Sequence, residues 1–250
     1  MMRKLSFVIG LLFFVIFPLV SATQENPAKE EAKEEREIEF HFEKARYDYK
    51  SKTYTFSKGE LTDVKEKARL VADEIIYNEE TDQATATGNI KFVDEENEIT
   101  ASSINVDLKE KMAVLEGGVT IVNVRKPKEE KTGAEKPKEE EKGLKRYWKD
   151  KTTLKCEKLR YNYKEKIAYL EDKVVVTQED KELTAKKVTW LEKEDKIILE
   201  GDVTLKDDKG QTMHCSKMVV CTKEDNEWID IEGPLSGLFK VKEKKESSSQ

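Results

Sequence analysis

Apolar residues alternate with charged and polar residues along most of this sequence, and the alternation restarts at regular intervals. Aligning the chain with itself on one small or apolar residue per repeat gives six anchors: Phe42, Ala72, Ala101, Cys156, Ala185 and Cys215. Successive anchors lie 29 or 30 residues apart, except for one interval of 55 residues between Ala101 and Cys156. The pattern therefore predicts six repeats, three on each side of an insertion.

The region around each anchor is predicted to be a half-buried β-strand. Apolar residues stand two positions before, three after and five after the anchor, as Leu70, Ile75 and Tyr77 do around Ala72. Alternation of aromatic and β-branched residues with polar ones is typical of a strand with one buried face. The apolar phase slips by one residue after the anchor, which indicates a bulge or a sharp bend midway along the strand.

A charged turn follows, and then a second alternating strand with a glycine near its middle: Gly88, Gly117 and Gly201. Gly59 and Gly233 are displaced by one or two positions, and Asp172 replaces the glycine once. We interpret this glycine as an inward position where the strand bends or approaches another backbone. Each repeat is then a bent β-hairpin. The predicted fold class is all-β, with repeated bent hairpins forming an open-edged β-jelly roll, or β-taco, of two facing antiparallel sheets.

The N-terminal segment predicts export. Arg3 and Lys4 precede an apolar run from 5 to 20, and Val20-Ser21-Ala22 supplies a small-residue cleavage pattern. These features predict a cleaved signal peptide over 1–22 and a periplasmic location. The alternative is a single N-terminal inner-membrane anchor, because the run is only slightly shorter than a membrane-spanning helix.

Composition divides the rest of the chain. Segments 23–37 and 242–250 are polar and are predicted to be a disordered leader and tail, and 125–151 is predicted to be a charged loop insertion. Repeats 1–3 then occupy 38–124, and repeats 4–6 occupy 152–241.

The charge balance limits the function classes. Charged residues make up 39% of the chain against 37% hydrophobic residues, and the formal net charge is −6. A chain of this sign has no general electrostatic reason to bind nucleic acid. The two histidines, His41 and His214, each precede an anchor and are expected on the outward face, so neither a metal site nor a cofactor is predicted. No catalytic motif breaks the repeat, and we expect no enzyme activity.

The cysteines are interpreted as structural. Cys156 and Cys215 occupy anchor positions where other repeats carry alanine, which is typical of small core residues. Two repeats of strand stacking would separate their Cα atoms by about 10 Å, beyond the reach of a disulfide. Cys221 is assigned to a turn, with a free thiol as one possible state, and a disulfide stays the alternative for an exported protein.

Three segments carry a family resemblance: ADEIIYNEETDQATATGNIKF (72–92), ITASSINVDLKEKMAVLEGGVTIV (99–122) and LTAKKVTWLEKEDKIILEGDVTL (183–205). Their pattern resembles the periplasmic lipopolysaccharide-transport β-jelly-roll family, which includes LptA/LptC-like and OstA-like (organic-solvent-tolerance) proteins. The resemblance implies a bridge that carries lipopolysaccharide between the inner and outer membranes, with acyl chains inside the jelly roll. It also implies partners: other jelly-roll transport proteins that join by edge-strand addition, or further copies of the same chain in a homo-oligomer.

Inward residues of mixed size can leave such an interior imperfectly filled, so that it accepts acyl chains by apolar burial. The candidate lipid-binding residues are Ala72, Ile75, Tyr77, Ile104, Val106, Leu159, Tyr161, Val188 and Trp190. One alternative is a structural or cell-surface β-repeat protein without a lipid ligand. A β-helical enzyme acting on polysaccharides is a third hypothesis.

Overall fold

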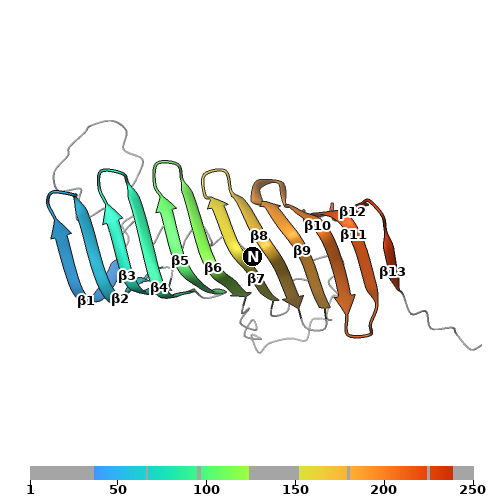
Figure 1. Cartoon of the computed structure of the whole chain (residues 1–250), viewed down its shortest axis with the longest axis horizontal. Coiled ribbons are helices and arrows are strands. Elements are labelled where there is room, and N and C mark those ends of the chain that lie inside the picture. The colour runs from blue at the N-terminus through green and yellow to red at the C-terminus, as the bar shows by residue number, and fades with distance from the viewer. Residues whose placement is uncertain are drawn as a thin grey trace, which may run out of the picture.

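The computed structural model describes residues 37–65, 67–94, 97–123, 152–178, 181–223 and 226–238. Within them, strands follow one another along the long axis of the molecule (Figure 1). The first six are β1 (Ile38–Asp48), β2 (Thr53–Asp63), β3 (Ala68–Asn78), β4 (Gln83–Val93), β5 (Asn97–Asp107) and β6 (Met112–Asn123). The others are β7 (Thr152–Asn162), β8 (Ile167–Gln178), β9 (Lys181–Leu191), β10 (Lys196–Asp207), β11 (Thr212–Cys221), β12 (Trp228–Glu232) and β13 (Ser236–Leu238).

All these strands belong to one antiparallel sheet in which each strand pairs with the next along the chain. Only β13 leaves this order, because it pairs with β11 beside β12. The sheet continues through the position of the insertion, since β6 pairs with β7 from Met112↔Asn162 to Asn123↔Thr152. The six odd-numbered strands β1 to β11 carry the six anchors, so the repeated hairpins predicted from the sequence are confirmed.

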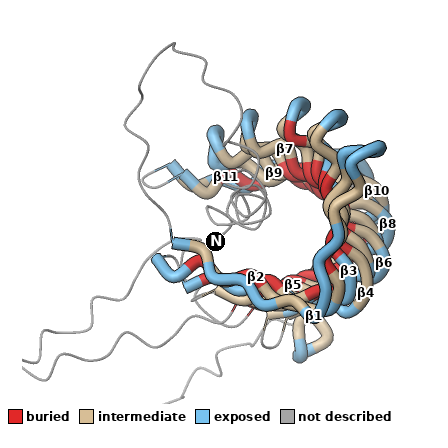
Figure 2. The backbone as a smooth tube through the Cα atoms, turned by 90° about the vertical axis from the view of Figure 1, so that its left-hand side faces the viewer, coloured by how far each residue is buried: buried red, intermediate tan, exposed pale blue. Residues whose placement is uncertain are grey.

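The sheet bends midway along its strands. Every strand pair from β3–β4 to β10–β11 has a register shift at this point, for example between Glu116 and Val119 where β6 meets β7. The β1–β2 and β2–β3 pairs have no such shift. The bend folds the sheet into a C-shaped cross-section (Figure 2). The predicted fold class is therefore confirmed, and the two facing sheets are the two halves of one continuous sheet.

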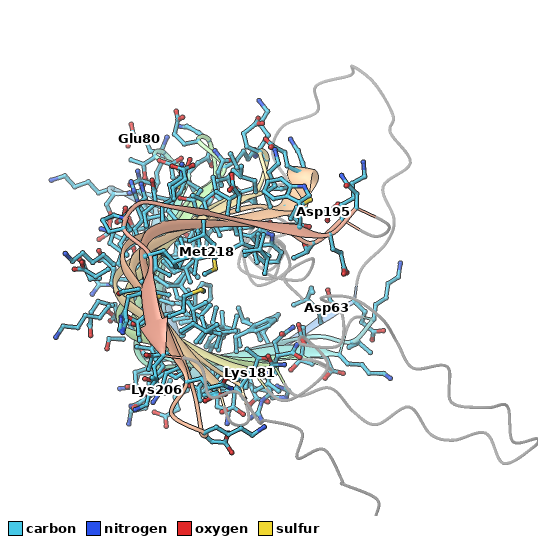
Figure 3. The ribbon with its side chains drawn as sticks, turned by 90° about the vertical axis from the view of Figure 1, so that its right-hand side faces the viewer. Asp63, Glu80, Lys181, Asp195, Lys206 and Met218 are labelled. Carbon is cyan, nitrogen blue, oxygen red and sulfur yellow. The ribbon has the colours of Figure 1, made fainter. Side chains whose placement is uncertain are left out.

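We call the half next to the turns within repeats the turn arm, and the half next to the connections between repeats the connection arm. Asp195 lies at the tip of the turn arm, whereas Asp63 and Lys181 lie on the connection arm (Figure 3). The side chain of Met218 points into the space between the arms, and that of Lys206 points outward.

The glycine at each bend faces outward, so its predicted inward position is wrong. Gly88, Gly117 and Gly201 have φ values of 70°, 82° and 78°, within the left-handed region. A Cβ on Gly117 would lie 2.5 Å from the side chain of Ser102, an exposed outer residue. Asp172, which replaces glycine in the fourth repeat, adopts the same backbone conformation with φ of 61°. The recurring requirement is thus a left-handed residue in the bulge of the even-numbered strand.

Four of the turns within repeats begin with an Asp or Asn that closes the turn. Asn78 Oδ1 accepts hydrogen bonds from the backbone N–H groups of Glu80 and Thr81, and Asp48, Asp107 and Asn162 act similarly. Such bonds explain why Asx residues recur at the ends of these strands. Leu191 cannot make them, and a 3₁₀ turn, η2 (Glu192–Glu194), follows it instead.

The predicted signal peptide, the charged insertion and the tail lie outside the described residues, as does the predicted leader apart from residue 37. No helix among the described residues is long and apolar enough to cross a membrane.

Candidate functional site

The inner faces of both arms are apolar, and they meet in one core cluster that runs along the sheet. On the turn arm, two inward rows cross the strands in register. One row alternates large residues on odd strands with alanines on even strands: Tyr77, Ala84, Val106, Ala113, Tyr161, Ala168 and Trp190. The small residues leave room for the large side chains of neighbouring strands, so the alternation lets the row pack at even strand spacing.

All nine candidate lipid-binding residues lie on the inner face of odd strands, as the sequence pattern predicts. On β3, β5, β7 and β9, eight of them lie in the two inward rows of the turn arm, and Ala72 lies at the bend of β3. Eight of them are buried with at most 6% of their surface exposed: Ala72, Ile75, Tyr77, Ile104, Val106, Leu159, Tyr161 and Val188. Trp190 alone among the nine is only partly buried.

The interior becomes accessible toward the C-terminal end. The inward connection-arm row is sealed from Leu61 to Leu154, which are 1% and 8% exposed, but its continuation is partly exposed. We call the partly exposed inward residues of β8 to β11 the C-terminal interior: Val176, Leu183, Trp190, Ile197, Leu205 and Met213. Five of them were not among the candidates. Their inward position follows from the alternation, but their exposure depends on neighbours that periodicity does not reveal.

A polar row runs along the inner edge of the connection arm. Asn97, Asn123 and Thr152 are buried there on adjacent strands, and Asn123 Nδ2 donates a hydrogen bond to Asn97 Oδ1 at 3.0 Å. Buried amides are tolerated when they hydrogen-bond one another. This edge of the interior therefore carries amide and hydroxyl groups rather than apolar ones.

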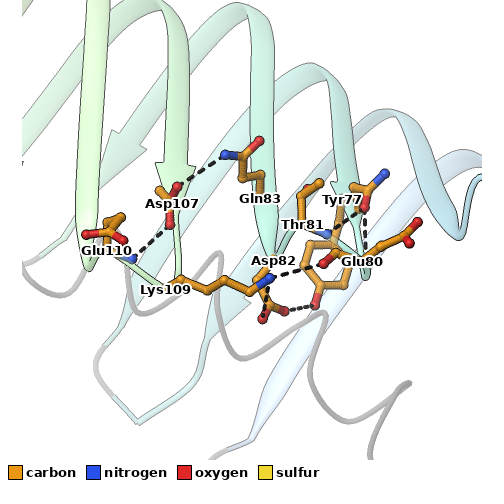
Figure 4. Close-up of polar contacts among 9 residues, drawn as sticks. Tyr77, Glu80, Thr81, Asp82, Gln83, Asp107, Lys109 and Glu110 are labelled. Atoms are coloured by element: carbon orange, nitrogen blue, oxygen red, sulfur yellow. Dashed lines mark hydrogen bonds and ion pairs between the residues drawn. The ribbon is translucent and has the colours of Figure 1, made fainter.

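The opposite inner edge carries tyrosine hydroxyls bound to carboxylates. Tyr77 donates to Asp82 at 3.1 Å, and Tyr47 donates to Glu79 of the next repeat at 3.0 Å (Figure 4 shows the Tyr77 contact). Burial, followed by the bond to Asp82, raises the pKa of Tyr77 well above its ordinary value. Lys109 crosses to the Glu80 carbonyl oxygen, tying successive turns together (Figure 4). These contacts fix the spacing of the turns along the edge.

The three cysteines are free and buried. Cys156 and Cys215 face the interior, as predicted, and burial raises the pKa of the Cys156 thiol to about 12. Their predicted separation was too small because each repeat contributes two strands to the same sheet. β7 and β11 are four strands apart, or about 19 Å. The turn assignment of Cys221 is wrong, since it is the buried last residue of β11.

His41 and His214 are exposed on the outer face, as expected. No cluster of three or more His, Cys, Asp or Glu side chains within the described ranges is arranged to hold a metal ion. The arrangement that remains is an apolar interior, sealed over its centre and accessible near β8 to β11.

Comparison with solved structures finds a similar fold in LptH from Pseudomonas aeruginosa, described as the LptA homologous periplasmic component of the conserved lipopolysaccharide transport device. The match covers 51% of this chain and 77% of LptH, at 15% sequence identity and a TM-score of 0.37. No protein-family model matches the sequence, and comparison with curated protein sequences finds no match.

Proposed function

We propose that the chain is a periplasmic lipopolysaccharide-binding transport module that shields acyl chains in the interior of its bent sheet. In this role it bridges the inner- and outer-membrane assembly machinery. The observation that carries the proposal is the C-terminal interior, where apolar side chains face inward yet remain partly exposed. The choice of lipopolysaccharide among lipids rests on the resemblance of the repeats to the transport family.

The chemistry of the C-terminal interior suits an acyl chain. Its six residues are aliphatic, aromatic or thioether side chains from both arms, so an entering chain would be covered on two sides. Each buried methylene contributes about 0.8 kcal/mol, so burial of ten methylenes provides on the order of 8 kcal/mol before the cost of ordering. The proposed lipid site is therefore β8 to β11 rather than the whole row of nine residues predicted from the sequence.

The edge strands of the sheet offer a place where a partner protein can add a strand. Among the described residues, the 11-residue strand β1 pairs only with β2, so its outer backbone there is available for an added strand. Phe40 on this edge strand is 56% exposed, and a joining strand would cover it. At the other end, β12 and β13 have five and three residues, so that edge offers less continuous backbone. We propose that a second jelly-roll protein adds at β1.

The lipid proposal is tested by photo-crosslinking in cells. A photoreactive residue at Trp190 or Leu183 should capture lipopolysaccharide. Tyr77 occupies the position of Trp190 in the second repeat but is sealed, so it is a matched inward control that should capture far less. Lys186 is the outward control on the same strand as Trp190. Equal capture at Lys186 and Trp190, or none at Trp190 and Leu183, would contradict the proposal.

A second candidate function is a structural β-repeat protein without a lipid ligand. The sealed centre from β2 to β7 favours it, because Leu70, Ile104 and Leu159 have no exposed surface. In this case the partial exposure near β8 to β11 would reflect only a less complete core. Native mass spectrometry of the exported protein distinguishes the two, since only the transport module should retain a bound lipid.

A further inference from the structure

The outer face of the turn arm carries an unbroken row of alternating charges in its C-terminal part. Seven directly opposed residues on β6 to β12 form this row, which we call the charge ladder: Glu116, Lys158, Glu171, Lys187, Glu200, Lys217 and Glu232. Two of its ion pairs are closed within the sheet, Lys158 with Glu116 at 2.6 Å and Lys217 with Glu232 at 3.0 Å. The same row on β2 to β5 holds Ser57, Glu74, Thr87 and Ser103, so the alternation begins only at β6.

Beside the ladder, toward the turns, the outer face is largely uncharged. We call six outward residues of β8 to β12 the outer patch: Ile167, Tyr169, Leu191, Ile198, Val219 and Trp228. The first five are partly exposed, and Trp228 is 38% exposed. The corresponding positions on β2 to β5 are mostly polar, among them Thr53, Thr85, Gln83 and Asn105. An apolar outer surface limited to one part of a repeated sheet indicates an interaction site.

We propose that this face binds the same face of a second copy of the chain, around a two-fold axis that runs parallel to the strands between β9 and β10. Such an axis reverses the strand order, so β9 faces β10 of the second copy, β8 faces β11 and β7 faces β12. Ladder residues of opposite sign then meet: Lys187 faces Glu200 of the second copy, and Glu171 faces its Lys217. A surface that is complementary to itself in this way forms an isologous dimer.

The Arg160–Asp230 pairing distinguishes this axis from the neighbouring ones. The axis brings Tyr169 onto Val219 of the second copy, Thr189 onto its Ile198 and Leu191 onto its Lys196. It also places Arg160 against Asp230 of the second copy, which extends the charge complementarity outside the ladder. Arg160 and Asp230 lie in the same outward row, Arg160 on β7 and Asp230 on β12. Moving the axis by one strand, to between β8 and β9, would set Arg160 against Ile198 of the second copy instead.

The size of the face predicts a weak dimer. The six strands β7 to β12, separated by five spacings of about 4.8 Å, and three outward rows cover roughly 24 Å by 20 Å, on the order of 500 Å² per copy. That area is at the low end for specific complexes, so association should depend on concentration. Two sheets that pack face to face cross at about 30°, so the outward rows of the two copies are best aligned near the two-fold axis.

Disulfide trapping tests the proposed register in the exported full-length protein. Tyr169 and Val219 lie three strands apart in one chain, about 14 Å, and cannot form an internal bridge. A Y169C/V219C variant should form covalent dimers on mild oxidation, whereas either single variant should not. T55C/N105C is the matched control in the same row, with the same three-strand separation, on β2 and β5. Equal dimer yield from the two double variants would overturn the proposal.

Charge reversal provides an independent test by sedimentation over a concentration series. D230K changes an exposed residue and places two positive charges together at each Arg160 contact, so it should weaken association by about tenfold or more. Adding R160E should restore association, because Arg160 and Asp230 are too far apart to interact within one chain. R160E alone is the control, since it also breaks the ion pair between Arg160 and Glu171 of the same sheet, at 2.6 Å. A monomer at every concentration, or a D230K variant that associates like the wild type, would show that the face does not bind a second copy.

Discussion

The N-terminal half of the sheet, β1 to β6, and the C-terminal half, β7 to β13, share one backbone plan but differ in both faces. Inside, Leu61, Leu70 and Ile104 are sealed in the first half, whereas Leu183 and Trp190 remain partly exposed in the second. Outside, the first half carries mainly hydroxyl, amide and acidic groups, and the second carries the outer patch and every ladder residue except Glu116 on β6.

This difference does not come from a break in the sheet. β6 and β7 pair along their full length, and the Tyr163 N–H donates to the Lys111 carbonyl oxygen as its counterparts do between other turns. The same hairpin therefore accepts two sets of side chains. In the first half, β3 to β6 supply a closed core and β1 supplies a long edge strand. The second half supplies accessible apolar surface on the inside and on the outside.

The largest expected effect comes from truncating the same type of side chain in each half of the sheet. Leu70 and Leu183 each stand two residues before an anchor, but only Leu70 is fully buried. L70A should lower the free energy of unfolding by about 3–4 kcal/mol, because it leaves a cavity in a sealed core. L183A should cost about 1–2 kcal/mol, since water already reaches that side chain. Urea denaturation measures both, and equal losses would mean that the interior is sealed along its whole length.

A smaller effect is expected at the bends, where β6 of the first half and β8 of the second use different residues for the same conformation. Gly117 has φ of 82° and faces the Ser102 side chain at 2.5 Å from an added Cβ, so G117A should destabilise by about 1–2 kcal/mol. Asp172 already has a side chain at φ of 61°, so D172G should be neutral or stabilise by up to about 1 kcal/mol. Thermal unfolding of the two variants gives the signs. A destabilised D172G would mean that the carboxylate makes a contact that glycine loses.

Periodicity was sufficient to predict the hairpins, their bends and the inward positions, because a strand with one buried face must alternate. It could not predict that both halves of each bent hairpin lie in one sheet, and the error in the Cys156–Cys215 separation follows from that. The outward position of the bend glycines was also missed. A glycine at an inward position and a glycine in an outward bulge both interrupt the alternation, so the sequence pattern does not distinguish them. The φ value of the residue does.

The candidate site shows a second limit of periodicity. Tyr77 and Trp190 have the same place in their repeats, yet one is sealed and the other is accessible. Exposure depends on what the opposite arm presents across the interior, and alternation along one strand carries no information about that. The charge ladder could have been identified in the sequence only after the register of every strand pair was known, because its successive members are 13 to 42 residues apart in the sequence.

The smallest effect at neutral pH is expected where a turn residue differs between the halves. Leu108 and Tyr163 both follow directly after an odd strand and pack inward, but the buried Tyr163 hydroxyl has no hydrogen-bond acceptor among the described residues. Y163F should therefore be neutral or stabilise by up to about 1 kcal/mol at pH 7. Burial, followed by the charge of Asp107, raises the pKa of Tyr163 to about 12. Its folded pKa exceeds the unfolded value of 10.0, so its contribution is complete below pH 10 and is lost as the pH rises toward 12. Chemical denaturation between pH 8 and 12 should show Y163F losing less stability than the wild type over that range. Parallel curves for the two proteins would mean that the phenol ionises as freely in the folded chain as in the unfolded one.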